Sequence, residues 1–152
     1  MIRIRQAEPG DWSQLAAMRA LLWPDASAPE HLAELESGQF SLGQGQFPVV
    51  TLVSEDERGA LTGFLEVGLR SHADGCDTRR PVGFVEGWFV REEHRGKGVG
   101  KELMHAAEEW ARTQGCLEMA SDALIDNTGS ERAHTALGFE IVDRCVHFRK
   151  AL

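Results

Sequence analysis

The chain has 152 residues, with 24 acidic side chains, 16 basic side chains and a net charge of −8. This length predicts one domain over residues 1–152, with a substantial core, and the acidic balance argues against nucleic-acid binding, which needs Lys and Arg to neutralise phosphates. An acidic surface instead favours cationic partners. No stretch approaches the roughly 18 apolar residues of a membrane span, so we expect no membrane partner.

The three cysteines are Cys76, Cys116 and Cys145. An odd number, wide spacing and the absence of a CxxC pair argue against a disulfide framework, a zinc ribbon or a redox motif. They indicate reduced thiols and therefore a cytoplasmic protein.

The first quarter of the chain predicts one strand and two helices. Residues 2–7 alternate apolar and polar side chains, as a strand does. A helical repeat of apolar residues follows and stops at Pro24. Ser27 and Glu30 form a capping-box pattern that opens a second helix, which we expect to end at Gly38.

The middle of the chain predicts three strands. Residues 48–53 and 60–70 are apolar runs on either side of a turn at 56–59, and they should pair as an antiparallel hairpin. Residues 71–81 form a loop. Residues 82–90 form a strand that is buried along most of its length.

The last third predicts two helices and two strands. Residues 98–113 carry one apolar stripe and form the clearest helix. A short strand over 116–122, a helix over 129–137 and a final strand over 139–150 follow. The resulting order, β-α-α-β-β-β-α-β-α-β, predicts an α/β fold with a mixed sheet covered by helices.

Three glycines, Gly96, Gly98 and Gly100, lie where the helix over 98–113 has to begin. Glycine inside a helix costs roughly 1 kcal/mol relative to alanine. The first turn of a helix offers unpaired N–H groups to phosphates, and glycine lets the main chain approach such a ligand. The segment matches neither GxxxxGK[ST] nor GxGxxG. HExxH and GxSxG are also absent, which argues against a metal enzyme and a serine hydrolase.

The remaining pattern, Arg95-x-x-Gly98-x-Gly100, resembles the acyl-CoA pyrophosphate loop of the GNAT superfamily of N-acetyltransferases. A wider set of motifs resembles the aminoglycoside 6′-N-acetyltransferases in particular. These motifs are Leu22-Trp23-Pro24, Gly75-Cys76-Asp77, Glu86-Gly87-x-Phe89-Val90, Glu118 to Asp122, Asn127-Thr128 and Phe148-Arg149-Lys150. The resemblance implies a mixed, mainly antiparallel sheet flanked by helices. It also implies acetyl-CoA as co-substrate, no metal, antibiotic resistance as the role, and a homodimer with exchanged or continued C-terminal strands.

On the acceptor side, the resemblance implies that Glu86 and Asp122 bind aminoglycoside amines and help to deprotonate the attacking amine. Carboxylates suit this task because aminoglycosides are polycations. Trp23 would form a wall for the sugar, and Asp143 would reach the substrate in its own subunit or in a partner subunit. Residue-level alternatives are an arginine partner for Glu86, a turn cap for Asp122 and core packing for Trp23.

On the cofactor side, Phe89 and Val90 should offer main-chain groups to the pantetheine arm, as an added strand would. Asn127 should hydrogen-bond to pantetheine, or else cap a helix. The pyrophosphate would lie in the loop formed by Arg95, Gly96, Lys97, Gly98, Val99, Gly100 and Lys101.

The sequence departs from the resembling family in two places. It has no tyrosine, and His134 stands where many members carry the tyrosine that protonates the departing thiolate. His134 could donate that proton, hold the sulfur by a hydrogen bond, or be a helix histidine with structural partners only. His72 and Asp74 stand in place of an Asp-Tyr pair, so they could take over part of the substrate contact.

Two other functions share these sequence features. One is acetyl transfer to a polyamine, an amino acid or a protein terminus, which would use the same cofactor loop. The other is a CoA-binding regulator without catalysis. The acidic residues on the strands favour the aminoglycoside enzyme over both.

Overall fold

A computed structural model gives the fold and describes residues 2–38 and 47–152. Two short 3-10 turns, at Pro9–Asp11 and Glu92–His94, accompany the regular elements. These elements are β1 (Arg3–Gln6), α1 (Trp12–Leu22), α2 (Ala28–Ser37), β2 (Val49–Glu55), β3 (Leu61–Arg70), β4 (Val82–Val90), α3 (Val99–Thr113), β5 (Met119–Ser121) and α4 (Thr128–Ala136).

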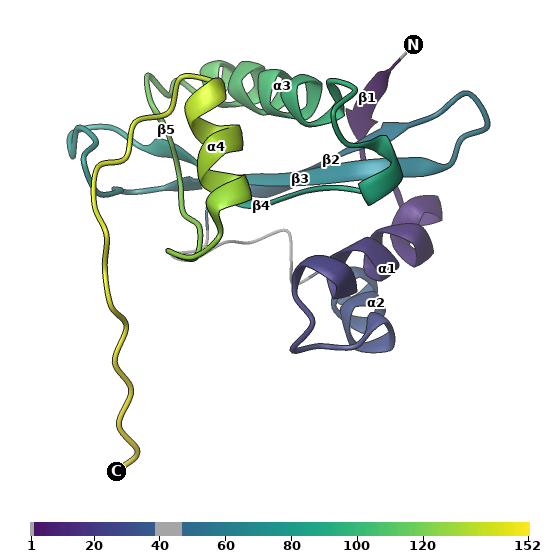
Figure 1. Ribbon diagram of the computed structural model, residues 1–152, viewed down its shortest axis with the longest axis horizontal. Helices are drawn as coiled ribbons and strands as arrows, with labels where there is room; N and C mark the ends of the chain where they lie inside the picture. The colour runs from purple at the N-terminus through teal and green to yellow at the C-terminus, as the bar shows by residue number, and fades with distance from the viewer. Residues whose placement is uncertain (1, 39–46) are drawn as a thin grey trace.

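The strands form one sheet in the order β1-β2-β3-β4-β5. Neighbours from β1 to β4 are antiparallel, and β4 and β5 are parallel. Helices α1 and α2 lie on one side of the sheet, and α3 lies on the other (Figure 1). This arrangement confirms the predicted mixed, mainly antiparallel sheet flanked by helices.

Each face of the sheet buries its own apolar cluster. Under α3, Leu65, Val67 and Val85 of the sheet pack with Leu103 and Met104 of the helix. On the opposite face, Val53 and Phe64 pack with residues of α1 and α2, among them Leu15, Met18 and Leu35. Burial of these side chains contributes about 1.5–3 kcal/mol each, so the sheet is fixed from both sides.

The second helix begins and ends as its sequence predicts. The Ser27 hydroxyl accepts a hydrogen bond from the Glu30 N–H, and the Glu30 carboxylate accepts one from the Ser27 N–H. Gly38 follows the helix with φ = +75°, a conformation that favours glycine. The capping box therefore forms as predicted.

The predicted final strand over residues 139–150 is wrong. Among the described residues, no strand follows α4, and residues 143–152 are exposed. Figure 1 shows this segment running away from the body of the molecule to the C-terminus. An alternating pattern makes a strand only where another strand offers unpaired backbone groups, and this chain places none beside the segment.

The strand expected over 116–122 is shorter than predicted and covers only Met119–Ser121. The Cys116 N–H donates to the Ala111 carbonyl and Gly115 has φ = +85°, so these residues complete the end of α3.

Within residues 2–38 and 47–152, no helix is long and apolar enough to cross a membrane. The same residues contain no group of three or more His, Cys, Asp or Glu side chains placed to hold a metal ion.

Candidate active site

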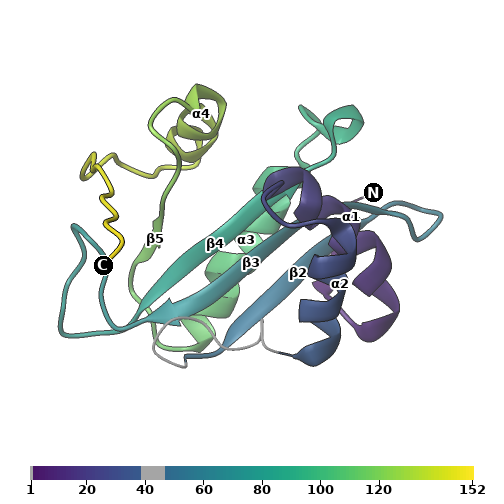
Figure 2. The ribbon, with the colours of Figure 1, turned by 90° about the horizontal axis from the view of Figure 1, so that it is seen from below.

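A bulge in β4 marks the centre of the site. Val85 pairs with Val67 and Gly87 pairs with Glu66, which leaves Glu86 as an extra residue between them. The parallel pairing of β4 with β5 also stops here, because Val85–Ser121 is its last pair. Figure 2 shows the two strands separating beyond this point toward α4. The bulge therefore places Glu86 where the sheet opens.

The opening leaves one edge of β4 without a strand partner among the described residues. Residues 87–90 pair with β3 on one side and lie beyond the last β5 pair on the other. Phe89 and Val90 belong to this free segment. Such an edge can accept an extended ligand as an added strand, as predicted for pantetheine.

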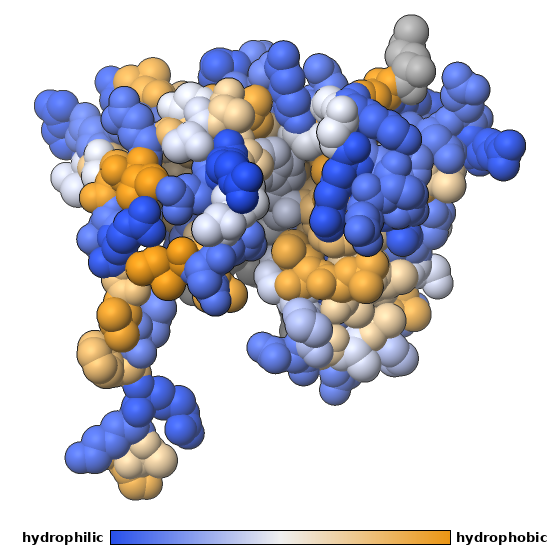
Figure 3. Space-filling model, viewed as in Figure 1, coloured by the Kyte–Doolittle hydropathy of each residue, from blue (hydrophilic) through white to orange (hydrophobic). Residues whose placement is uncertain are grey.

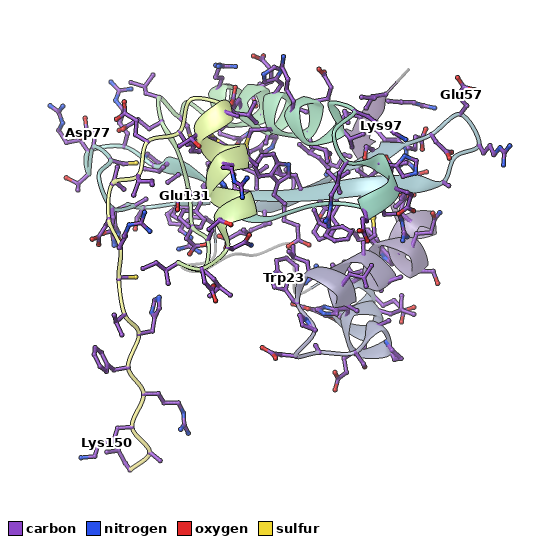
Figure 4. All side chains as sticks on the ribbon, in the orientation of Figure 1. Trp23, Glu57, Asp77, Lys97, Glu131 and Lys150 are labelled. Atoms are coloured by element: carbon purple, nitrogen blue, oxygen red, sulfur yellow. The ribbon has the colours of Figure 1, made fainter. Side chains whose placement is uncertain are left out.

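Trp23 packs against Gly87, the residue that follows Glu86 on β4. A Cβ atom added to Gly87 would lie 2.5 Å from the Trp23 ring, so only glycine leaves room for this contact. The ring also contacts Phe64 and His31, and Figure 4 shows Trp23 at the end of α1 that faces the sheet. Trp23 thus combines the predicted wall position with the alternative of core packing.

The carboxylate of Glu86 is paired with an arginine. Arg70 Nε donates to Glu86 Oε1 at 3.0 Å, and Arg70 Nη2 donates to Oε2 at 2.8 Å. The residue-level alternative of an arginine partner is therefore realised. Asp122 directly follows β5 and is exposed. It therefore lies just past the point where β5 separates from β4 beside Glu86.

A buried charge network lies behind Trp23. Arg19 donates to Glu66 at 2.6 Å and to Glu34 at 3.0 Å, and its guanidinium lies 5.2 Å from the centroid of the Trp23 ring. Burial raises the pKa of Glu66 to about 7, and the Arg19 charge opposes this rise. The nearby Glu34 and Glu86 carboxylates raise it further.

The glycine loop has the backbone geometry expected of a phosphate site. Gly96 and Gly98 have φ values of +73° and +87°, and Gly98 is the N-cap of α3. The first hydrogen bond of α3 runs from Glu102 N–H to the Gly98 carbonyl, so earlier N–H groups have no helical partner. Arg95 and Lys97 fold back onto loop carbonyls of Val90 and Glu93. Lys101 is exposed to solvent, whereas Val99 is buried.

His134 lies between β4 and β5 with both ring nitrogens occupied. Nδ1 lies 2.7 Å from the Ser130 carbonyl, and Nε2 lies 2.7 Å from the Ser121 hydroxyl. A carbonyl only accepts hydrogen bonds, so Nδ1 carries the proton, and a neutral Nε2 accepts from Ser121. The ring also meets Trp88 and Phe139 edge-on, with centroids 5.1 and 5.2 Å apart.

Asn127 takes the capping position that was its alternative. Its side-chain oxygen accepts a hydrogen bond from the Ser130 N–H, as an N-cap of α4 does. The side chain is exposed.

The loop after β3 brings three predicted residues into one region. His72 and Asp74 are exposed, and a Cβ atom on the neighbouring Gly75 would lie 2.8 Å from Val142. Asp143 follows Val142 and is exposed, with a hydrogen bond from the Arg144 N–H. The structure gives none of the three a contact with Glu86 or Asp122.

Three features of the site were missed by sequence reasoning: Arg70, the Arg19–Glu66 pair and Ser121. A Glu-Gly dipeptide inside an apolar strand is a signal for a bulge, and a buried Glu66 on β3 implies a cation nearby. The partner's identity follows only from the strand register, which the sequence did not reveal.

Comparisons with known proteins agree with this geometry. A sequence model of the Acetyltransferase (GNAT) family matches residues 15–139. An aminoglycoside N(6′)-acetyltransferase type 1 of Stenotrophomonas maltophilia is 41% identical over 98% of this chain and 93% of its own length. One of Klebsiella aerogenes is 39% identical over 98% of this chain and 96% of its own length.

Solved structures show the same similarity. The AAC(6′)-Iy complex with the bisubstrate analogue CoA-S-monomethyl-acetylneamine covers 100% of this chain and 99% of its own, with 34% identity and a TM-score of 0.85. AAC(6′)-Ih of Acinetobacter baumannii covers the same shares, with 32% identity and a TM-score of 0.85. The sheet opening and the glycine loop agree with these matches, which extend over nearly the whole chain. The chain therefore belongs to the acetyltransferase (GNAT) family.

Proposed function

We propose that this enzyme transfers the acetyl group of acetyl-CoA to the 6′-amine of an aminoglycoside antibiotic. The observation that carries the proposal is the position of Glu86 at the point where β4 and β5 separate, next in sequence to Gly87, against which the Trp23 ring packs. A carboxylate and an aromatic face suit a cationic amino sugar. Relatives that match nearly the whole chain carry this activity in their names.

The residues of the opening fit acetyl-CoA, which supplies an acetyl group activated as a thioester. The edge of β4 at Phe89 and Val90 has no second strand partner among the described residues and is the edge we assign to pantetheine, although the Val90 carbonyl already accepts a hydrogen bond from Arg95. Gly98, at φ = +87° and with no side-chain atom nearer than 3.9 Å to an added Cβ, leaves an open approach to the first turn of α3. That turn suits the pyrophosphate, and we assign Asn127, the N-cap of α4, to pantetheine.

The acceptor amine must lose its proton before it attacks. Glu86 stands on β4 and Asp122 directly follows β5, so they are the groups we assign to binding and deprotonating the amine, directly or through water. Asp74 and Asp143 are exposed and add negative charge for the rest of a polycation, and the exposed His72 offers it a hydrogen-bonding side chain in the same loop as Asp74.

We assign His134 a supporting role in protonating the departing thiolate. In its neutral form it accepts from Ser121 and has no proton to give at Nε2. Only the protonated imidazole donates toward Ser121, so any proton from His134 passes through that hydroxyl.

Direct attack by the amine is the mechanism that the thiols support. Burial raises the pKa values of Cys76 and Cys116, which disfavours the thiolate that a covalent intermediate would need. All three cysteines are free, which supports a reducing, cytoplasmic location.

The active form that we propose is a homodimer in which residues 139–152 lie against a second copy. The support is the exposure of apolar side chains on this segment, which include Val142, Val146 and Phe148. Figure 3 shows orange and pale orange atoms alternating with blue ones along the projecting chain. A second sheet edge would supply the strand partner that this chain lacks, and it would bring Asp143 near one of the two sites.

The function is tested by measuring CoA thiol release from acetyl-CoA with a panel of amines. The panel contains kanamycin, tobramycin, an aminoglycoside without a 6′-amine, spermidine and a peptide. We expect turnover only with 6′-amino drugs. Turnover with spermidine or peptide alone would make the protein an acetyltransferase of another amine, and silence with acetyl-CoA bound would favour a CoA-binding regulator.

A further inference from the structure

Arg70 holds Glu86 more firmly than a surface ion pair would. Its guanidinium makes two hydrogen bonds to the carboxylate, one to each oxygen. The same guanidinium lies 3.5 Å from the centroid of the Phe84 ring. Both charged side chains are about three-quarters buried, with exposed fractions of 24% and 25%. Stacking and a fork of two hydrogen bonds together fix the arginine in one position.

Glu86 needs such a partner because the sheet does not fix its direction. It is the extra residue of the bulge, so no cross-strand residue lies opposite it. Arg70, at the end of β3, reaches along β4 past Phe84 to the carboxylate. A carboxylate has about four acceptor positions, and the Arg70 fork uses two, so Glu86 can still accept from a substrate amine.

The charges around Glu86 come from several elements. On β3, Glu66 interacts with Glu86 electrostatically, and Glu66 is paired with Arg19 of α1, which also holds Glu34 of α2. Asp122 lies just beyond β5, and α4 places His134 against Trp88 of β4.

Helix α3 buries only apolar residues, which are Val99, Leu103, Met104, Ala107 and Ala111. Among the described residues, Arg70 is the cation hydrogen-bonded to Glu86.

We propose that Arg70 is a positioning residue that fixes the Glu86 carboxylate and selects the neutral form of the acceptor amine. This inference rests on the proposed function of the site. An ammonium bound to Glu86 would lie close to the Arg70 guanidinium, and like charges disfavour the protonated form. Glu86 alone would hold an ammonium tightly and unreactively. With Arg70 beside it, the carboxylate orients an amine that is ready to attack.

The test compares kcat as a function of pH for the wild type and four variants, with a 6′-amino aminoglycoside at saturating acetyl-CoA. Arg70→Gln and Arg70→Met remove the charge, the second while keeping an apolar stack on Phe84, and Arg70→Lys keeps the charge. Arg112→Gln is the matched control, since it removes an arginine from an exposed ion pair on α3. A thermal melt of each variant confirms folding.

We expect the rise of kcat with pH to move up by about one pH unit in both neutral variants, because kcat reports the ionisation of bound groups. At pH 7 the KM for the drug should fall several-fold together with kcat, since ammonium then binds in an unproductive form. Arg70→Lys should restore the wild-type midpoint, and Arg112→Gln should not move it. A purely structural role would raise KM and leave the midpoint unchanged.

An unchanged midpoint in a folded neutral variant, with an active wild type, overturns the role of Arg70 alone. A wild type that acetylates no 6′-amino drug overturns both this inference and the proposed function. The two failures are therefore distinguished by the wild-type activity.

Discussion

At the residue scale, the acceptor side of the site depends on buried charges that are arranged in pairs. Glu66 is held by Arg19, and Glu86 is held by Arg70. Removing one partner of a buried pair such as Arg19–Glu66 costs about 3–5 kcal/mol, because the other charge is left without compensation, and the partly buried Arg70–Glu86 pair should cost less. Both pairs lie against elements that carry Trp23 or the bulge, so they connect stability to substrate binding.

Glu66 makes protein stability depend on pH in a defined direction. Its pKa rises from 4.5 to about 7 on folding, so between these values the folded protein binds more protons than the unfolded chain. Stability contributed by this group is present below pH 4.5 and is lost as the pH rises to about 7. Between pH 5 and 8, the wild type should lose up to about 3 kcal/mol relative to Glu66→Gln. Urea unfolding of both proteins at several pH values measures this, and parallel stability curves would contradict it.

At the element scale, the start of α3 is the part of the cofactor site that the sequence defined best. Residues 98–113 were predicted as a helix, and the structure has α3 at Val99–Thr113. The three glycines predicted a loop that approaches a phosphate, and two of them adopt left-handed backbone conformations. The left-handed conformations account for two of the glycines by backbone geometry alone. The phosphate ligand that we propose would also account for a glycine loop at the start of a helix.

Gly98→Ala tests that second explanation, with Gly115→Ala as its matched control. Both glycines have left-handed φ values, +87° and +85°, and they lie at opposite ends of α3. Neither site is crowded, since an added Cβ would meet nothing nearer than 3.9 Å. We expect each variant to lose about 1–2 kcal/mol of stability.

Only Gly98→Ala should also raise the KM for acetyl-CoA, by about tenfold, because its new methyl group stands in the path of the phosphate. Steady-state kinetics and chemical denaturation of the two variants give the comparison. Equal effects of both variants on acetyl-CoA binding would contradict the proposal that the pyrophosphate binds at this turn.

Elements that depend on distant partners were predicted less well. The helices and the hairpin follow from local periodicity, capping residues and turn residues, and the structure has them close to their predicted bounds. The pairing of Arg70 with Glu86 depends on the β3–β4 register across a loop of eleven residues, 71–81. The final strand failed for the related reason that a strand forms only with a partner edge, which this chain does not place there.

At the scale of the whole molecule, the homodimer that we propose depends on the exposed C-terminal segment, residues 139–152. Val146 and Phe148 are 75% and 93% exposed, and such exposed apolar side chains mark an interaction surface. The substitution of both by aspartate should convert the homodimer that we propose to a monomer, because the charges cannot be buried in an interface. Light scattering coupled to size-exclusion chromatography measures the mass.

The matched control is Leu117→Asp, which changes a side chain with similar exposure, 74%, outside the C-terminal segment. It should leave the dimer intact. A wild type that runs as a monomer at all concentrations would contradict the homodimer and would leave Asp143 to act within its own chain.

The measurement that tests the central claim most directly is the kinetics of Glu86→Gln, with Glu57→Gln in the exposed β2–β3 turn as its control. With tobramycin as acceptor, we expect Glu86→Gln to lower kcat/KM for the drug by about 100-fold and to leave the KM for acetyl-CoA unchanged. Glu57→Gln should match the wild type in both. Loss of acetyl-CoA binding with an unchanged kcat/KM for the drug would contradict the account, because Glu86 would then belong to the cofactor site.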